Sequence, residues 1–513
     1  MSARNKAQRP RRGGRRERMQ RERAKSEMVS RSIPIKVGFR TLDLLDTANI
    51  ERIHEGSLEI LNRTGVVFRS DEAIGYFRRA GARIQGERVY IEEDLILQAL
   101  SSAPASYTLR ARSPHNNVTI GGGCCAVMAG GGPPFVRDHG GERRTGTLAD
   151  VERFTRISCL SPEIHVVGRK PVEAQDVPAE TRHLHCWRAI LTLADKPVQS
   201  GFVNGKPESM DALEMLAIVF GGEDALRSGP VAHCSVNVNS PLVYDSAMVE
   251  SLIEFARYGQ VNLISPFVMA GVSGPTTLAG ALALQNAEVL AGIVLTQLVN
   301  PGVPVLYGTA SSNVDMRTGA PAIGSPESAA CIAACAQLAR RYNLPCRGGG
   351  ALTDSPVPDA QSNYERMFTL LTSVLCGVNY LMHGAGILES YLTMSYEQLM
   401  LDLDQIAMVR SLVKGIDVSD DLLALNTIHD VGPGGMFLDA DHTLEHCREA
   451  FFRPRIGIRQ SFEQWQAEGA KDALARAKNY CETMLESYRE PALESSRREE
   501  LEQFVERRSG ELL

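Results

Sequence analysis

The chain has 513 residues, of which 43% are hydrophobic and 23% are charged, a composition that is ordinary for a globular protein. Its net charge of −6 is uneven: residues 1–31 hold twelve Lys or Arg and three Glu, which leaves −15 for the remainder and argues against nucleic acid as the main ligand. The most membrane-like stretch, residues 275–299, carries Glu288 in its middle, and no short apolar core follows the basic N-terminus, so the sequence predicts neither a membrane protein nor a signal peptide.

Residues 1–35 are predicted to be a disordered basic tail, because Gly, Pro and charged residues leave little that could pack. A solvated tail without a specific role is the simpler interpretation, and contact with nucleic acid or an acidic partner is the alternative. Residues 36–150 contain one amphipathic helix, "DTANIERIHEGSLEILNRTG", followed by short segments that are typical of hairpins and loops. We therefore expect residues 36–150 to form an N-terminal α+β portion that packs on the rest of the chain.

Residues 151–460 alternate short apolar strands with helices, which predicts a parallel sheet. The predicted strands are "IHVVG", "PVQSGF", "VAHCSVNVN", "VNLISPFVMAG", "VPVLYG", "CRGGGA" and "NYLMHGAGI", and the predicted helices cover residues 179–194, 208–219, 245–258, 275–299, 325–342 and 360–376. Seven such units, with an eighth expected in residues 420–460, favour a (β/α)8 TIM barrel. An open doubly wound sheet stays as the alternative, because the spacing is the same in both.

Residues 461–513 are charged and helical, and we expect them to form a C-terminal helical arm that packs on the body or joins copies in a homo-oligomer. The fold class predicted from the sequence is therefore α/β, a TIM barrel with an N-terminal α+β extension and this arm. Eleven cysteines are scattered through the chain, many of them in apolar runs, which indicates reduced thiols and a cytoplasmic location.

Barrel enzymes carry their reactive groups at the carboxyl ends of the strands, so the polar and aromatic residues after each predicted strand are site candidates. His383 ends an apolar strand beside glycines that let a ligand approach the backbone, with a core histidine as the alternative. Asn237 and Asn239 alternate along one strand and are expected to face the same side, with sheet-edge polarity as the alternative. The remaining candidates are Asp138, Phe267, Tyr307, Asp354, Gln361 and Glu389.

Aromatic residues near strand ends, Phe267 and Tyr307 among them, could surround a cationic ammonium group, although core packing is the usual role of such residues. Motifs for other sites are missing. "GGGCCAVMAGGG" lacks the glycine spacing of a dinucleotide site, and there is neither a P-loop lysine nor a C-x-x-C pair. His442 and His446 lack the glutamate of a zinc protease motif, so the sequence predicts no metal site.

Four motifs, "GGPPFVRD", "GGALTDSPVPDAQSNYER", "NYLMHGAGILES" and "GPGGMFLDADHTLEHCREAFFRPR", together with residues 265–308, resemble the trimethylamine–corrinoid protein methyltransferase family over residues 36–460. The resemblance implies a (β/α)8 barrel that moves a methyl group from a methylated amine to the cob(I)alamin of a separate corrinoid protein. The partner would dock over the barrel mouth and supply the corrinoid, so that no cofactor is bound permanently.

The resemblance also implies roles for the candidates. A carboxylate of Asp138, Asp354 or Glu389, with aromatic faces, could hold the substrate cation, and Asn237 with His383 could bind a substrate carboxylate, as in a betaine. We expect His383, Asp354 and Glu389 to act at the reacting centre and the other candidates to bind substrate.

The sequence departs from the trimethylamine-specific members in one respect, because they carry pyrrolysine in the barrel and this chain contains only the twenty common residues. It therefore resembles the non-pyrrolysine, glycine betaine methyltransferase-like branch. We expect a quaternary amine as substrate and poor turnover of trimethylamine. A metal-thiolate barrel methyltransferase and a non-catalytic quaternary-amine binding protein stay as the alternatives.

Overall fold

The computed structural model describes residues 32–138 and 141–513, so most of the predicted tail 1–35 lies outside the described residues. The centre of the molecule is a curled sheet in which each strand pairs in parallel with the next. In sheet order these strands are β10 (Val167–Gly168), β11 (Val198–Phe202), β12 (Ala232–Val236), β14 (Val261–Ile264), β16 (Val305–Gly308), β19 (Cys346–Gly349), β20 (Tyr380–Met382) and β7 (Cys124–Val127).

The two ends of this run of strands lie next to each other. Met128, directly after β7, forms a parallel bridge with Val166, directly before β10. The backbone N–H groups of His165 and Val166 both donate to the Val127 carbonyl oxygen, at 2.8 and 3.2 Å. The result is a mixed α/β fold built on a strongly curled parallel sheet.

The eighth strand does not come from residues 420–460, and that expectation is wrong. The segment holds only the short helices α14 (Asp420–Leu423), α15 (Leu425–Val431) and α16 (Asp441–His446). The missing strand is β7, which lies in the glycine-rich run that the sequence assigned to hairpins and loops of the N-terminal portion. A four-residue strand in a glycine-rich run carries too little periodicity to be recognised, and pairing with β20 is what makes it a strand.

Side chains alternate between the two faces of the curled sheet, as the two-residue period of a strand requires. On the concave side, one separate cluster contains alternate strand residues such as Ala126, Leu263, Leu306 and Tyr380. The antiparallel hairpin β5 (Ser106–Leu109) and β6 (Val118–Gly121) adds Tyr107 to this cluster and continues the sheet beyond β7, which also pairs with β1 (Ile35–Lys36). The larger core lies on the convex side, between strands and helices.

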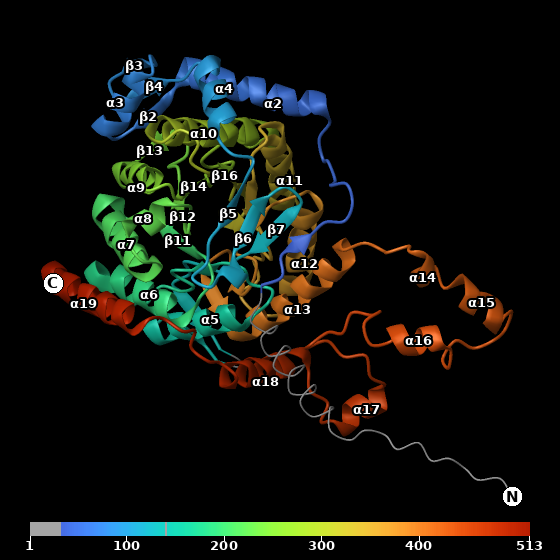
Figure 1. The fold of residues 1–513 in the computed structure, drawn as a ribbon. Helices are drawn as coiled ribbons and strands as arrows, with labels where there is room; N and C mark the ends of the chain where they lie inside the picture. The colour runs from blue at the N-terminus through green and yellow to red at the C-terminus, as the bar shows by residue number, and fades with distance from the viewer. Residues whose placement is uncertain (1–31, 139–140) are drawn as a thin grey trace, which may run out of the picture.

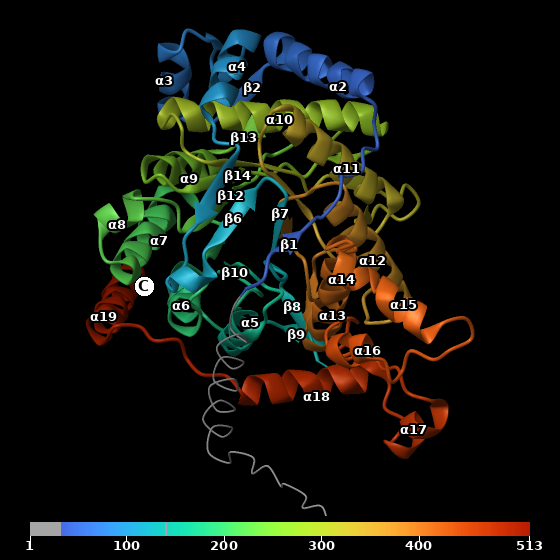
Figure 2. The ribbon, with the colours of Figure 1, turned by 45° about the vertical axis from the view of Figure 1, so that its right-hand side comes forward.

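A helix follows each parallel strand and covers the convex face, as Figures 1 and 2 show. These helices are α5 (Leu148–Leu160), α6 (Ala179–Leu193), α7 (Gly205–Phe220), α9 (Ser246–Arg257), α10 (Leu278–Val299), α11 (Pro326–Arg341), α12 (Ala360–Leu375) and α13 (Tyr396–Val413), with the short α8 (Glu223–Arg227) after α7. The helices predicted from the sequence over residues 179–376 are thereby confirmed, and so are the seven predicted strands.

The surroundings of helix α10 account for its apolar sequence. The helix is long and apolar enough to cross a membrane, but 78% of its most apolar window is buried inside the molecule. The N-terminal helices α2 (Thr47–Glu59), α3 (Asp71–Arg79) and α4 (Glu93–Ser102) pack on the side of α10 that faces away from the sheet, and α9 and α11 flank it (Figure 1). A helix enclosed in this way needs an apolar surface all round.

The N-terminal portion also forms a small sheet with the α/β region that contains the curled sheet. Strands β2 (Val66–Phe68), β3 (Arg83–Gln85) and β4 (Arg88–Tyr90) pair in the order β13-β2-β4-β3, where β13 (Val243–Tyr244) belongs to the connection after β12. The single π-helical turn Ile60–Thr64 joins α2 to β2, and the short 3-10 turn Pro114–Asn116 joins β5 to β6. The N-terminal portion is therefore fixed to the body by strand pairing as well as by helix packing.

Two further small sheets are built from the connections that follow the parallel strands. One contains β15 (Met269–Ala270), β17 (Ser312–Val314) and β18 (Pro321–Ala322), and the other contains β21 (Ile387–Leu388), β22 (Thr393–Ser395), β8 (Phe135–Arg137) and β9 (Arg143–Thr145). Since all these connections leave the carboxyl ends of parallel strands, they form a rim around that end of the curled sheet.

The C-terminal segment packs on the outside of the body. Helix α18 (Ala473–Glu486) packs on α13 and α5, and α19 (Ser495–Leu512) packs on α6 and α7. Between α13 and α18 the chain runs out through α14, α15, α16 and α17 (Phe462–Ala467), which project from the body in Figures 1 and 2.

Candidate functional site

A cavity of about 270 Å³ opens at the carboxyl ends of the parallel strands. Each of the eight strands, or the turn directly after it, contributes to its wall, which is the position where barrel-like enzymes bind substrates. In strand order from β7, the contributing residues are Met128, Gly168, Gln199, Ser235, Ser265, Ala310, Arg347 and Met382.

Three rings form one wall near the mouth of the cavity. The centroid of the Tyr391 ring lies 4.7 Å from that of His383 and 6.3 Å from that of Phe267, which it meets edge to face. His383 Nδ1 accepts a hydrogen bond from the Gly131 N–H at 3.3 Å, which assigns the ring proton to Nε2. Burial, together with the nearby positive charge of Arg347, lowers the pKa of His383 to about 3, so the imidazole is neutral at physiological pH.

Arg347 enters the cavity from β19 and is 2% exposed. Its Nη1 donates to Ser265 Oγ at 3.2 Å and to the Thr309 carbonyl oxygen. Its Nε is buried and has no hydrogen-bond partner among the described residues. Burial lowers the pKa of Arg347, because few groups here compensate the charge.

The cavity has two further cations at its edge, and each of them lies beside a carboxylate. Lys170 Nζ lies 2.7 Å from a carboxylate oxygen of Glu173. Arg169 Nη1 lies 3.6 Å from a carboxylate oxygen of Glu208. The positive charges of the rim are therefore largely neutralised within the chain.

Below the cavity, a chain of hydrogen bonds fills the concave side of the sheet. Tyr107 Oη lies 2.8 Å from His233 Nε2, and His233 Nδ1 lies 3.1 Å from Gln199 Oε1. The Gln199 amide also donates to Ser235 Oγ at 2.8 Å and accepts from Tyr380 Oη at 3.3 Å. Burial lowers the pKa of His233 to about 3, so this floor is polar, neutral and fully occupied by its own partners.

Three of the residues predicted from the sequence meet in the cavity: Asn237, Phe267 and His383. Asn239 does not. Strand β12 ends at Val236, the chain then turns, and Asn239 Nδ2 donates to Asp245 at 3.0 Å on the exposed side of the turn. The alternation expected for Asn237 and Asn239 therefore ends with the strand.

Tyr307 points away from the cavity. It is fully buried between the sheet and the helices, where its hydroxyl donates to Asn286 Oδ1 at 2.9 Å. Its neighbour Leu306 is the residue of β16 that faces the concave side. The aromatic position near the mouth is held instead by Tyr391, which the sequence did not suggest.

Asp354 and Glu389 do not line the cavity but hold the turn that carries Tyr391. The Asp354 carboxylate accepts from Ser390 Oγ at 2.6 Å and from the backbone N–H groups of Ile323 and Gly324 at 2.9 and 3.0 Å. Glu389 pairs with Arg143 at 2.6 Å and accepts from Thr393 Oγ1 at 2.7 Å.

The backbone of this turn is strained. Glu389, Ser390 and Tyr391 have φ angles of 54°, 47° and 77°, in the left-handed region that residues other than glycine rarely adopt. Such strain is common at functional sites and persists only when surrounding contacts enforce it. The carboxylates of Asp354 and Glu389 supply those contacts, and burial raises the pKa of Asp354.

The two other predicted residues lie outside the cavity. Asp138 is half-buried beside Arg144, with a carboxylate oxygen 3.3 Å from its Nη2. Gln361 Nε2 donates to Glu365 Oε1 at 2.9 Å at the start of α12. Glu365 in turn accepts from Thr353 Oγ1 at 2.6 Å and from the Asp354 N–H at 3.0 Å, so Gln361 contacts a residue that supports the rim.

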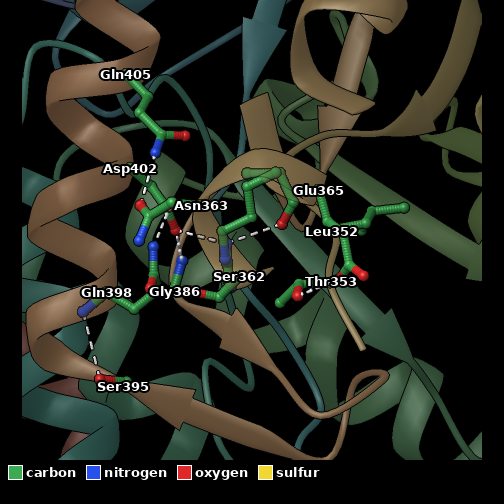
Figure 3. A network of polar contacts seen from close by, with 12 residues as sticks. Leu352, Thr353, Ser362, Asn363, Glu365, Gly386, Ser395, Gln398, Asp402 and Gln405 are labelled. Carbon is green, nitrogen blue, oxygen red and sulfur yellow. Dashed lines mark hydrogen bonds and ion pairs between the residues drawn. The ribbon is translucent and has the colours of Figure 1, made fainter. Parts of the chain in front are cut away.

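A buried polar network joins these turns to the helices behind them (Figure 3). Asp402 on α13 accepts from the Gly386 N–H at 2.6 Å and from Gln398 Nε2 at 2.9 Å. Arg366 on α12 donates to Asp402 at 2.7 Å and to the Ala351 carbonyl oxygen at 2.9 Å, and both charged side chains are fully buried. The pair therefore fixes the backbones after β19, which carries Arg347, and after β20, which His383 directly follows.

Of the two cavity residues that the sequence analysis missed, Arg347 and Tyr391, only Arg347 has a recognisable signal in the sequence. Arg347 is a single charged residue inside a strand that is otherwise apolar and glycine-rich, "CRGGGA". A buried charge is costly, so a lone arginine in such a strand indicates a function. Tyr391 follows "GILES" with no distinguishing pattern, and only the turn brings it to the cavity.

Among residues 32–138 and 141–513, no three His, Cys, Asp or Glu side chains are arranged to hold a metal ion. His183 pairs with Asp211 at 2.9 Å, and burial raises the pKa of the Cys346 thiol to about 12. The metal-thiolate alternative therefore finds no donor set in the described part of the chain.

Comparison with known proteins gives consistent results. A family model described as "Trimethylamine methyltransferase (MTTB)" matches residues 11–512. The chain is 40% identical to a glycine betaine methyltransferase of Desulfitobacterium hafniense (strain Y51), over 92% of this chain and 98% of that protein. It is 36% identical to a trimethylamine methyltransferase, MttB, of Desulfitobacterium hafniense (strain DSM 10664 / DCB-2), over 90% and 92%.

A more distant relative is the proline betaine:corrinoid methyltransferase of Eubacterium limosum, which is 29% identical over 90% of this chain and 96% of that protein. Among solved structures, the monomethylamine methyltransferase (MtmB) of Methanosarcina barkeri superposes with a TM-score of 0.52 over 87% of this chain and 88% of that chain. At 12% sequence identity, this likeness concerns the fold alone.

Proposed function

The chain belongs to the trimethylamine methyltransferase family, and on that premise we propose that it moves a methyl group from a methylated amine to the cob(I)alamin of a separate corrinoid protein. It is a methyltransferase, and the family resemblance found in the sequence is confirmed. The observation that carries the proposal is the small cavity at the strand ends, with an aromatic wall of Phe267, Tyr391 and neutral His383.

The wall suits a methylated ammonium group. Ring faces attract a cation through their quadrupole, and the effect grows where water is excluded. A quaternary ammonium ion is already positive, and the tertiary amine that leaves is neutral, so the chain needs no nucleophile and no proton donor of its own. Its residues bind the cation, orient one methyl group towards the mouth and keep water away.

The corrinoid supplies the nucleophile, and we propose that it comes from a partner protein. A cavity of about 270 Å³ is slightly smaller than the roughly 300–1,000 Å³ that is usual for small-molecule sites, so it has room for a small amine but not for a corrin macrocycle. In this proposal the partner docks at the rim, and the chain itself holds no permanent cofactor. The cytoplasmic location and the possibility of a homo-oligomer stay predictions from the sequence.

We also propose that the curled sheet is a complete (β/α)8 barrel. The bridge between Met128 and Val166 supports this, because the edge strands of an open doubly wound sheet stay apart. A helix after every parallel strand supports it as well. The roles predicted for Asn237, Phe267 and His383 then fit a site at the barrel mouth.

We propose a quaternary amine as the substrate. Two relatives are named for betaines, and the chain lacks pyrrolysine. The test is a panel of methylated amines with a reduced corrinoid protein, followed by the absorbance change of cobalt. Methylation from a quaternary amine is the expected result, with trimethylamine slower by at least about tenfold.

Two outcomes would count against the proposal. Rapid methylation from trimethylamine would overturn the choice of a quaternary substrate. Binding of a quaternary amine without any methyl transfer, in the presence of an active corrinoid protein, would favour the non-catalytic binding protein instead.

A further inference from the structure

Arg347 differs from the other cations of the cavity, because it forms no ion pair with a described carboxylate. Lys170 and Arg169 lie beside Glu173 and Glu208, as described above. The groups that interact electrostatically with Arg347 are Tyr391, Tyr380, Cys346 and His383, which are all neutral at physiological pH. A buried charge without a counter-charge is costly, so its retention needs a reason.

Only one of the three nitrogen atoms of the Arg347 guanidinium group donates hydrogen bonds to described residues. Nη1 is occupied by Ser265 Oγ and the Thr309 carbonyl oxygen. Neither Nε nor Nη2 donates a hydrogen bond to a described residue, and Nε is buried. These two N–H groups point the same way from one edge of the planar group, and that edge matches the two oxygens of a carboxylate.

We propose that Arg347 is the carboxylate subsite of the cavity, and that the substrate is a zwitterion with a quaternary ammonium group a short distance from a carboxylate. This rests on the proposed function, since it assigns the two ends of the methylated amine within one cavity. The ammonium group lies against Phe267 and Tyr391, and the carboxylate lies on the Nε–Nη2 edge of Arg347.

The same arrangement discriminates against simpler amines. A cation without a carboxylate would enter a cavity that already holds the uncompensated charge of Arg347, and like charges repel more strongly away from water. A zwitterion brings its own counter-charge and satisfies the two unpaired donors. The cavity should therefore select glycine betaine over choline, which has the same trimethylammonium group and a neutral hydroxymethyl group in place of the carboxylate.

The subsite also changes the roles expected from the sequence, in which Asn237 and His383 bind the substrate carboxylate. His383 is neutral, and its Nδ1 is already occupied by the Gly131 N–H. Asn237 lines the cavity but carries no charge. Each of them can orient the substrate, whereas Arg347 provides the positive charge that distinguishes a carboxylate from a hydroxyl group.

The test is calorimetric titration of the full chain with glycine betaine and with choline, without a corrinoid protein. For the wild type, glycine betaine should bind at least about tenfold more tightly than choline. In Arg347→Met, glycine betaine should bind about 10- to 100-fold more weakly, which is the usual effect of losing a charge-assisted pair. Choline should bind that variant as tightly as the wild type or more tightly, because the repelling charge is gone.

Two further variants keep the test decisive. Arg347→Lys retains the charge but loses the flat edge, so the affinity for glycine betaine should fall by about tenfold while the affinity for choline stays unchanged. This variant keeps the test possible if Arg347→Met does not fold. Arg317→Gln is the control, since Arg317 is 92% exposed on the loop before β18 and should leave both affinities unchanged.

The outcomes separate this inference from the proposed function. Equal affinity for the two ligands in the wild type, or equal weakening of both in the Arg347 variants, overturns the carboxylate subsite. Selective binding of glycine betaine with no methyl transfer would refute the proposed function and still support the carboxylate subsite. Methyl transfer from choline and glycine betaine with equal kcat/KM would refute the carboxylate subsite and still support the proposed function.

Discussion

Replacement of Glu288 by glutamine should stabilise the protein above pH 7. Glu288 lies on α10, is fully buried, and forms no ion pair with a described cation. Its carboxyl oxygens accept from Ser240 Oγ at 2.8 Å and from the Leu242 N–H at 2.7 Å, in the connection between β12 and α9 that begins with Asn237. Burial raises the pKa of Glu288 from 4.5 to about 7, since two hydrogen bonds only partly offset the loss of water.

The sign of the effect follows from this raised pKa. In the unfolded chain the group loses its proton near pH 4.5, whereas the folded protein keeps it up to about pH 7. Stability is therefore lost as the pH rises through this window, by about 3 kcal/mol at roughly 1.4 kcal/mol per pH unit. Glutamine is neutral throughout and keeps one acceptor, and Ser240 Oγ can accept from its amide. We expect a gain of about 1–3 kcal/mol above pH 8 and no gain at pH 5.

The measurement is the urea midpoint of Glu288→Gln and of the wild type between pH 5 and pH 9. Glu254→Gln is the matched control, because Glu254 is also buried but pairs with Lys206 at 2.8 Å and Arg257 at 3.0 Å. The control should be destabilised by about 1 kcal/mol at every pH tested. A difference between Glu288→Gln and the wild type that does not change with pH, or that becomes destabilising at high pH, would refute the reasoning.

Three further outcomes are expected. Asp402→Asn should lower the free energy of unfolding by about 3–5 kcal/mol, because it leaves Arg366 buried without its partner, and the double replacement Arg366→Met with Asp402→Leu should recover most of the loss in the same urea assay. Tyr391→Leu should raise KM for the quaternary amine by about 3- to 30-fold, whereas KM of Tyr391→Phe should stay close to that of the wild type. An equal rise of KM in both variants would show that the hydroxyl group matters instead of the ring. Since the pKa of His383 is lowered to about 3, kcat/KM between pH 5 and pH 8 should not change through ionisation of this group. A change of kcat/KM with an apparent pKa near 6–7 that disappears in His383→Gln would contradict this.

Much of the fold could be predicted from the sequence, because the signals are local. Short apolar runs that end in Gly, Pro or Asn mark seven of the parallel strands, and helical periodicity marks the helices between them. The apolar composition of α10 predicted a helix buried on more than one side, and the N-terminal helices do cover it. The failure at β7 has the opposite cause, since these four residues of a glycine-rich run become a strand only through pairing with a neighbouring strand.

The candidate site could be predicted only in part. His383, Phe267 and Asn237 were predicted near strand ends, where a residue is recognisable from the chain, and they line the cavity. Tyr307 was misplaced, because the sequence of a four-residue strand buried on both faces does not show which side is concave.

The sequence by itself therefore determined the family and the order of seven parallel strands with the helices between them, since both depend on residues that are neighbours along the chain. The tertiary structure alone decided which side chains share the cavity. It turns Leu306 and Arg347 inward and Tyr307 outward, and it brings Tyr391 to the mouth on a strained turn. It also leaves Arg347 without a carboxylate partner among the described residues, which is a property of the space around a residue and cannot be recognised from the residues next to it in the chain.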